Sequence, residues 1–428
     1  MWVVLPAAIL LGFRLAWGWR AQRRLEGSLA RLRTMHVRLT PEEFPDDKSV
    51  PPGENAVDVL TAGPLGIQPN SAQEHLIYDP LEDQTEADKD ALLKLLAAHQ
   101  DIIDRIDAAD ACRVTAWTGR IFEPDGVPHI SGTRYFADLT VKAACIAYER
   151  HQDLLALRHL NRLLIEARIL EKSPTMFCAL YGNGLREIVA QGVEGIYPDL
   201  SVQDAATYAA AKLLLDRLLD DGAMPSGLAS SVDSLIAAYH TQTKGFTCIS
   251  LDRRDSDDLG WVLRPLAMED WARNLDQWAA IIKAWRAQSW PEFKRLKGEV
   301  PYPPEVYDHM NTMLSLEASG NRDYVSERYE RVLANLVHIR AAGLLLASRL
   351  YVVHYRTPPA RLADLAAILS PKFPVDPFAG GQQPLHYRLD ADGPTVWSVG
   401  RDGVNNQGDT TMDLVYGAAT MAPPAPPQ

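Results

Sequence analysis

The sequence has few cysteines, and none of them lies close to another. Cys112, Cys145, Cys178 and Cys248 form no CxxC pair and no Cys/His pair at the spacing of zinc ligands. This spacing argues against a thioredoxin-like redox motif and against a compact zinc site. The cysteines lie among apolar residues, so we expect small core side chains, although their even number also permits disulfides.

The sequence also lacks the short motifs of several common chemistries. It contains no P-loop, no GxSxG nucleophile elbow and no HExxH zinc motif. Its histidines have no Ser, Cys or ligand partner in a recognised pattern: His151, His159, His309 and His338. The alternation expected of a parallel sheet is missing, and no convincing internal repeat is present. No reaction can be assigned from motifs alone.

The charge of the chain is unevenly spread, with a basic excess in the first 40 positions and an acidic excess after them. Residues 1–40 hold seven arginines and one acid, a charge of +6 in a chain of net charge −12, so the remainder carries −18. An acidic body repels phosphates, and we therefore expect no nucleic-acid partner. A basic stretch beside an apolar one indicates a membrane instead.

The apolar stretch covers residues 1–19 and is interrupted by Arg14. Its length is about the minimum for a spanning helix, roughly 17 to 20 residues. Trp2, Trp17 and Trp19 suit the two interfaces of a bilayer. We predict a retained, single-pass membrane anchor over 1–19, with a buried core helix as the alternative. The arginines that follow favour a cytoplasmic body by the positive-inside rule.

Residues 20–85 predict a basic stalk followed by an irregular linker. Leu25, Leu29 and Leu32 recur at helical spacing, and arginines occupy the other faces. We expect residues 1–34 to contact membrane lipid. The apolar run would insert, and the arginines would lie near anionic headgroups.

Residues 86–320 predict a helical body, because amphipathic segments follow one another with Pro and Gly clusters between them. One helical face carries tryptophans seven residues apart: Trp271, Trp278 and Trp285. Such a stripe forms either a binding face for a carbohydrate or a protein partner, or part of the core. The densest acidic cluster, 252–261, is expected to be a solvated loop.

Residues 321–418 predict a long helix over 324–356 and two strands over 384–389 and 395–400, joined by a "DADG" hairpin turn. The Pro/Ala-rich tail, 419–428, is expected to be disordered. The predicted fold class is therefore mainly α. It comprises an N-terminal membrane helix, a multi-helix body and a small C-terminal α+β module with a short antiparallel sheet.

The C-terminal module contains a characteristic string of turn and aromatic residues. The string is Asp376, Pro377, Phe378 and Gly380, then Tyr387 and Arg388, then Trp397, Ser398, Gly400, Asp402 and Gly403, and then Asp409 and Asp413. It resembles the C-terminal half of the major pseudopilin of type II secretion, over less than a fifth of the chain. The leader and the helix glutamate of that family are missing here. The whole layout is similar to a set of uncharacterised bacterial membrane-anchored helical proteins.

In the pseudopilin family the last loop binds calcium, which implies a calcium site here. The hard oxygen ligands would come from Asp402, Asn405, Asn406, Asp409 and Asp413. The loop does not fit an EF-hand, because its third position is Val404 and its glycine comes late. An Asx-rich turn without metal is the alternative. The resemblance also implies a bacterial inner-membrane protein with its body outside the cytoplasm, against the positive-inside rule.

Two functions remain open at this stage. The first is a non-enzymatic, membrane-anchored scaffold or component of an envelope or secretion assembly, with a protein partner and a calcium-stabilised module. The second is a membrane-tethered hydrolase, acting for example on carbohydrate, with its site in the helical body near Trp261 to Trp290. No carboxylate pair of the glycosidase kind is recognisable in that body.

Overall fold

The structure is a computed structural model, and it describes most of the chain. The described residues are 4–39, 43, 50–51, 53–117, 132–173, 176–202, 204–220, short runs between 265 and 289, 290–298, 322–369 and 373–417. Several sequence predictions lie outside them. These are Trp278 and Trp285, the acidic cluster 252–261, Cys248 and the tail 419–428.

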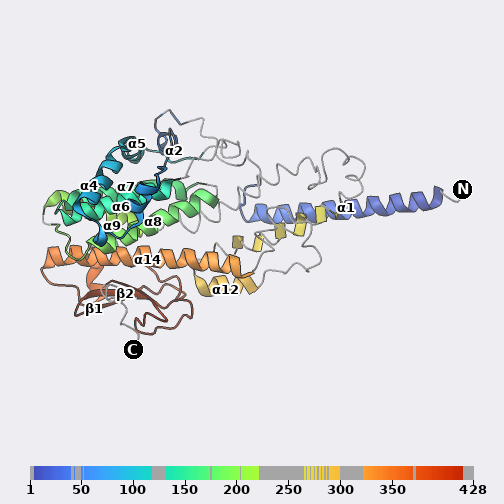
Figure 1. Cartoon of the computed structure of the whole chain (residues 1–428). Helices are drawn as coiled ribbons and strands as arrows, with labels where there is room; N and C mark the ends of the chain where they lie inside the picture. Colours follow the sequence, from blue (N-terminus) through green and yellow to red (C-terminus); the bar gives the residue numbers. More distant parts are fainter. Residues whose placement is uncertain are drawn as a thin grey trace.

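The chain is mostly helical, with a small sheet near its C-terminus (Figure 1). The helices are α1 (Val4–Thr34), α2 (Ala56–Leu60), α3 (Ser71–Tyr78), η3 (Leu81–Asp83), α4 (Glu86–Ala97), α5 (Gln100–Asp110), α6 (Thr133–Glu149), α7 (Asp153–Glu171), α8 (Met176–Ile196), α9 (Ala205–Leu219), α12 (Trp290–Gly298), α14 (Arg322–Tyr355) and η6 (Leu362–Ala367). The strands are β1 (His386–Asp390), β2 (Gly393–Ser398) and β3 (Leu414–Gly417). The coarse prediction, a mainly α chain with a short antiparallel sheet, is confirmed.

Helix α14 is the central layer of the molecule (Figure 1). One side of it packs against α8 and α9 of the helical body, and another side packs against β2 and β3. Its middle is therefore covered on both sides, and Val337, Leu344 and Leu345 are fully buried. Removal of this much apolar surface from water is the main force that holds the two layers together.

The helical body is built around α7, which packs against α6, α8 and α9. Local sequence signals begin several of these helices. Asn70 and Gln73 form a reciprocal capping box at α3, and Asp204 accepts hydrogen bonds from the first backbone amides of α9. Each cap satisfies amide donors that have no partner inside the helix.

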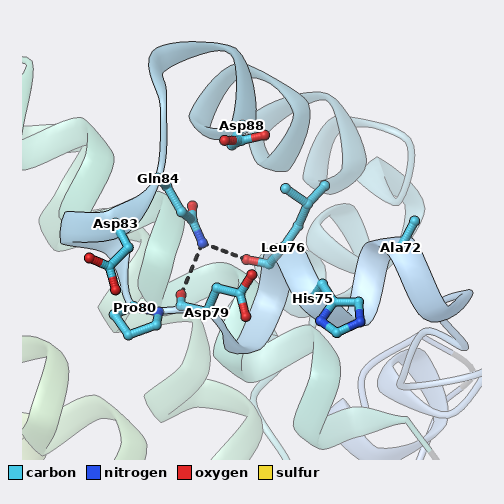
Figure 2. Close-up of a pocket in the computed structure, with 8 residues that line it drawn as sticks. All are labelled: Ala72, His75, Leu76, Asp79, Pro80, Asp83, Gln84 and Asp88. Atoms are coloured by element: carbon cyan, nitrogen blue, oxygen red, sulfur yellow. Dashed lines mark hydrogen bonds between the residues drawn. The ribbon is translucent and has the colours of Figure 1, made fainter.

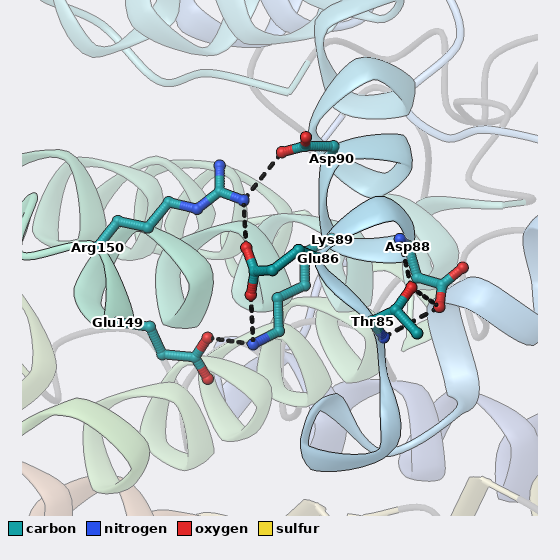
Figure 3. A network of polar contacts seen from close by, with 7 residues as sticks. All are labelled: Thr85, Glu86, Asp88, Lys89, Asp90, Glu149 and Arg150. Carbon is teal, nitrogen blue, oxygen red and sulfur yellow. Dashed lines mark hydrogen bonds and ion pairs between the residues drawn. The ribbon is translucent and has the colours of Figure 1, made fainter.

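A polar network on the surface fastens the start of α4 to the end of α6 (Figure 3). Arg150 donates to Glu86 at 3.0 Å and to Asp90 at 2.9 Å, and Lys89 donates to Glu149 at 2.6 Å. The hydrogen bond from Arg150, followed by that from Lys89, lowers the pKa of Glu86. Because most of these groups are exposed, we assign the network a role in orientation rather than a large share of stability.

The sheet is antiparallel, in the order β1-β2-β3. The predicted hairpin is confirmed, since Asp390 pairs with Gly393 across a two-residue turn. The first predicted strand begins two residues before β1 and ends one residue before β1 ends. The second predicted strand begins and ends two residues after β2 does. Strand β3 was not predicted. It pairs with β2 so that Val396 lies opposite Tyr416.

The described cysteines form no disulfide. Cys178 is buried, and Cys112 and Cys145 are half-buried against the core. Burial raises the pKa of the Cys145 thiol to about 11, which keeps it protonated and unreactive. The expectation of small core cysteines is confirmed for these three.

Candidate functional site

The first half of α1 exposes apolar side chains on every side. The exposed fractions are 62% for Ile9, 69% for Leu10, 49% for Leu11, 70% for Phe13, 58% for Leu15 and 61% for Trp19. Four of these positions lie within five residues of one another, so they point in different directions around the helix axis. A helix that is apolar all round requires an apolar environment, and the protein does not supply one here.

The exposed segment ends where a second part of the chain meets α1. Trp17 Nε1 donates to Glu269 Oε1 at 3.1 Å, and Arg31 donates to Asp276 Oδ1 at 3.0 Å. Farther on, Arg286 donates to the carbonyl of Met35. Residue numbers rise together on the two sides, so α1 and the segment 265–286 run in the same direction. We call this parallel pair, residues 18–35 with the described residues between 265 and 286, the stalk (Figure 1).

The stalk has an apolar seam of its own. Along α1, Ala21, Leu25, Ser28 and Leu32 are buried, at a spacing of three to four residues. In the second segment the buried residues follow the same rule: Met268, Trp271, Ala272, Leu275, Ala279 and Ile282. Trp271 is only 4% exposed, so it belongs to the core and is not part of an open binding face.

The described helix that best meets the criteria for crossing a membrane is a different one. By length and composition, Tyr329–Tyr355 within α14 qualifies, but 72% of its most apolar window is buried inside the protein. It is thus explained as the central core helix. Within the described residues, which begin at Val4, α1 does not meet these criteria. The anchor over 1–19 therefore stays a prediction that rests on exposure.

The loop between β2 and β3 holds the residues predicted to bind calcium. Asp402 Oδ1 accepts from the Val404 amide at 2.9 Å, and Asp409 Oδ1 accepts from the Thr411 amide at 2.9 Å. The Thr411 hydroxyl and then its amide lower the pKa of Asp409. Each of these carboxylates thus closes its own Asx turn.

Asp413 and Asn405 have different tasks in this loop. Asp413 is only 4% exposed and accepts from the amides of Asn406, at 3.3 Å, and Gly408, at 2.8 Å. Asn405 Oδ1 accepts from Trp397 Nε1 at 3.0 Å. The loop is therefore folded over the Trp397 ring by its own polar side chains.

The five predicted ligands are close in sequence, and Asn406 joins two of the others, since its Nδ2 donates to Asp402 Oδ2 and its amide donates to Asp413 Oδ1, both at 3.3 Å. Within the described residues, no group of three or more His, Cys, Asp or Glu side chains is placed to share a metal ion. The side chains of Asp402, Asn405 and Asp409 act in separate turns. The loop is thus built of hydrogen-bonded turns, and the calcium site stays a prediction.

Asp376 fixes the turn that precedes the sheet. It is fully buried, and its oxygens accept from Phe378 N at 2.9 Å, Ser398 Oγ at 2.7 Å and Val399 N at 3.0 Å. These bonds join the "DPF" turn to the end of β2. Asp376, a member of the residue string that resembles the pseudopilin, therefore holds a turn and a strand end together by hydrogen bonds.

Helix α12 joins the end of the stalk segment to this module. The Trp290 amide donates to the Pro377 carbonyl at 2.8 Å, and its Nε1 donates to the Arg401 carbonyl at 3.1 Å. Phe293 stacks on Tyr329 of α14 with ring centroids 4.1 Å apart. The C-terminal loop is thus held by the chain that comes from the stalk as well as by α14.

Figure 2 shows a surface cavity of about 320 Å³ between α3, η3 and α4. Asp79, Asp83 and Asp88 contribute carboxylates to its lining, and His75 contributes an imidazole. Gln84 Nε2 ties the wall together by donating to the carbonyls of Leu76 and Asp79. The acids here are exposed or engaged in capping, unlike the desolvated acid that a glycosidase needs.

Sequence reasoning missed a set of buried ionisable groups in α7. Glu166 is fully buried, and neither carboxylate oxygen has a hydrogen-bond partner in the described part of the chain. Burial raises its pKa to about 8, partly opposed by Arg105. Burial also disfavours the charged form of His159, and for this base it lowers the pKa, to about 4. The sequence does contain a sign of this burial, because Glu166 lies between Leu163 and Leu170 on the apolar face of the helix.

A second buried carboxylate, Glu171, lies 3.5 Å from the fully buried Arg186. Arg186 also donates to the carbonyls of Arg217, Leu218 and Asp220, which caps the C-terminal end of α9. Neither Glu166 nor Glu171 lines the cavity of Figure 2. Glu171 and Arg186 serve helix capping, and Glu166 is packed in the core. In the described part of the chain, neither carboxylate lies at the surface where a substrate could reach it.

No protein-family model, no curated protein and no solved structure matches the chain. The resemblance to the major pseudopilin and to uncharacterised membrane-anchored proteins therefore rests on the residue string alone.

Proposed function

We propose that the protein is a membrane-anchored scaffold. In this proposal the apolar first half of α1 lies in a bilayer, and the stalk carries the helical body and the C-terminal module outside it. One observation carries the proposal: six large apolar side chains between Ile9 and Trp19 are each about half exposed or more, on a helix that extends away from the body (Figure 1). Water is an unfavourable environment for such a surface.

The scaffold function is favoured over a hydrolase. Of the acids that line the cavity, Asp79 and Asp83 are exposed and Asp88 is engaged in capping, whereas the fully buried Glu166 lies away from the cavity. The segment from Trp261 to Trp290, where the hydrolase site was predicted, is described only in part, so that alternative stays a prediction. A role in an envelope or secretion assembly, and an extracytoplasmic body, rest on the resemblance.

Carbonate extraction of membranes tests the anchor. We expect the full chain to stay in the membrane pellet. The double variant Ile9→Asp/Phe13→Asp should appear in the supernatant, because each aspartate at the centre of a spanning helix costs roughly 2.5 to 3.5 kcal/mol. The matched control is Leu155→Asp/Leu213→Asp, which alters two exposed leucines on the body and should remain in the pellet. Release of the unaltered chain by carbonate would contradict the proposal.

A further inference from the structure

Three arginines lie directly after the exposed apolar segment of α1. Arg20, Arg23 and Arg24 are all exposed, and none forms an ion pair with an acid in the described part of the chain. Arg31 differs, because Asp276 neutralises it at 3.0 Å. Three exposed arginines without a described ion pair thus lie at the end of the stalk nearest the apolar segment, while Arg33 lies alone near the far end.

The same three arginines share one side of the helix. Successive residues are about 100° apart, so Arg20, Arg23 and Arg24 fall within an arc of about 100°. The stalk seam, marked by Leu25 and Leu32, lies on a different side. The arginines therefore face outward, away from the second stalk segment, and the packing of the stalk does not use them.

The position of these arginines along α1 would place them in the polar layer of a bilayer. A helix rises about 1.5 Å per residue, so Arg20 to Arg24 lie within about 8 Å of Trp19 along the axis. The polar layer on each side of the hydrocarbon is about 5 to 8 Å thick. The guanidinium of Arg23 lies 4.2 Å from the Trp19 ring centroid, which fixes it beside an interfacial tryptophan.

We propose that Arg20, Arg23 and Arg24 form a binding surface for the phosphate groups of anionic lipids. The inference rests on the proposed membrane anchoring and adds to it the class of lipid that surrounds the anchor. Guanidinium groups suit this task because they bind phosphate oxygens through paired donors and stay charged. A basic residue close to an anionic surface strengthens binding by about fivefold. The three together would therefore select anionic lipid over neutral lipid.

Reconstitution of the full chain in mixed bilayers tests the surface. The bilayers contain phosphatidylcholine with a minor fraction of phosphatidylglycerol, and the lipid retained after mild detergent extraction is measured by mass spectrometry. We expect several-fold enrichment of phosphatidylglycerol over its bulk ratio, which high salt should reduce because salt screens the charges. Arg20→Gln/Arg23→Gln/Arg24→Gln should return the retained lipid to the bulk ratio.

The control removes the same charge elsewhere. Arg113→Gln/Arg158→Gln/Arg331→Gln changes three exposed arginines of the body and of α14, and should keep the enrichment. A chain that enters the bilayer without enriching the anionic lipid, or a triple variant at 20, 23 and 24 that still enriches it, would overturn the lipid inference alone. A chain that does not enter the bilayer would overturn the anchor and with it the inference.

Discussion

At the scale of single residues, burial decides what the acidic side chains do. Asp376 is buried and accepts three hydrogen bonds, so its carboxyl oxygens join a turn to a strand. Glu166 is buried without such bonds, and an ionised carboxylate is costly in that position. Composition alone could not separate the two, since both appear in the sequence as one acid among many. The difference arises from contacts between distant segments.

Glu166 makes the stability of the protein depend on pH. The folded protein keeps this carboxyl protonated up to about pH 8, whereas the unfolded chain ionises it above about 4.3. The folded state therefore binds the extra proton between these values, and the free energy of unfolding falls as pH rises through that window. Above pH 8 the fall ends, because both states are ionised.

We expect Glu166→Gln to be more stable than the parent chain at pH 8, by a few kcal/mol, on the order of 2 to 4. The difference should shrink toward pH 5. Urea denaturation of the full chain in detergent at several pH values measures it. Glu82→Gln, at an exposed glutamate, is the control and should show no such trend. A constant difference between Glu166→Gln and the parent at all pH values would show that the carboxyl is already ionised when folded.

At the scale of elements, the sequence predicts local features better than pairings. The long apolar helix and the hairpin are confirmed, because helical periodicity and the "DADG" turn are encoded in adjacent residues. Strand β3 was missed, since four residues after a polar loop give almost no alternation. The stalk was predicted as one helix. Its second segment contacts α1 across about 250 residues of chain, and no local pattern specifies such a partner.

Trp271 tests the stalk as an element. Truncation of a buried tryptophan leaves a large cavity, so Trp271→Ala should cost about 3 to 5 kcal/mol and lower the melting temperature of the full chain. Leu213→Ala, at a half-exposed position on α9, should have little effect. Unchanged melting of Trp271→Ala together with lost binding of a sugar or protein would restore the binding-face interpretation.

The loop between β2 and β3 tests the calcium hypothesis. If the loop binds calcium only when folded, a hundredfold excess over the dissociation constant adds about 2.7 kcal/mol of stability. The full chain should then melt at a higher temperature in calcium than in chelator. Asp402→Ala and Asp409→Ala should remove the difference. Equal melting of the unaltered chain under both conditions would leave only the hydrogen-bonded turns described above.

At the scale of the whole molecule, two connections join the parts. Helix α14 links the helical body to the sheet, and α12 links the stalk to the C-terminal loop. The residues most useful for function, the exposed side chains from Ile9 to Trp19, were evident in the sequence as an apolar run. The sequence could not show that the body leaves them uncovered, because that depends on where the rest of the chain packs.

The length of the stalk has an electrostatic consequence for the body. Residues 41–428 carry a net charge of −18, and an anionic bilayer would repel them at close range. The α1 part of the stalk, from Ala21 to Thr34, spans about 21 Å at 1.5 Å per residue. The Debye length at physiological ionic strength is about 8 Å, so the repulsion falls to less than about a tenth over that distance. The stalk thus allows one chain to combine a basic segment at the membrane surface with an acidic body that lies beyond the range of the surface potential of the membrane.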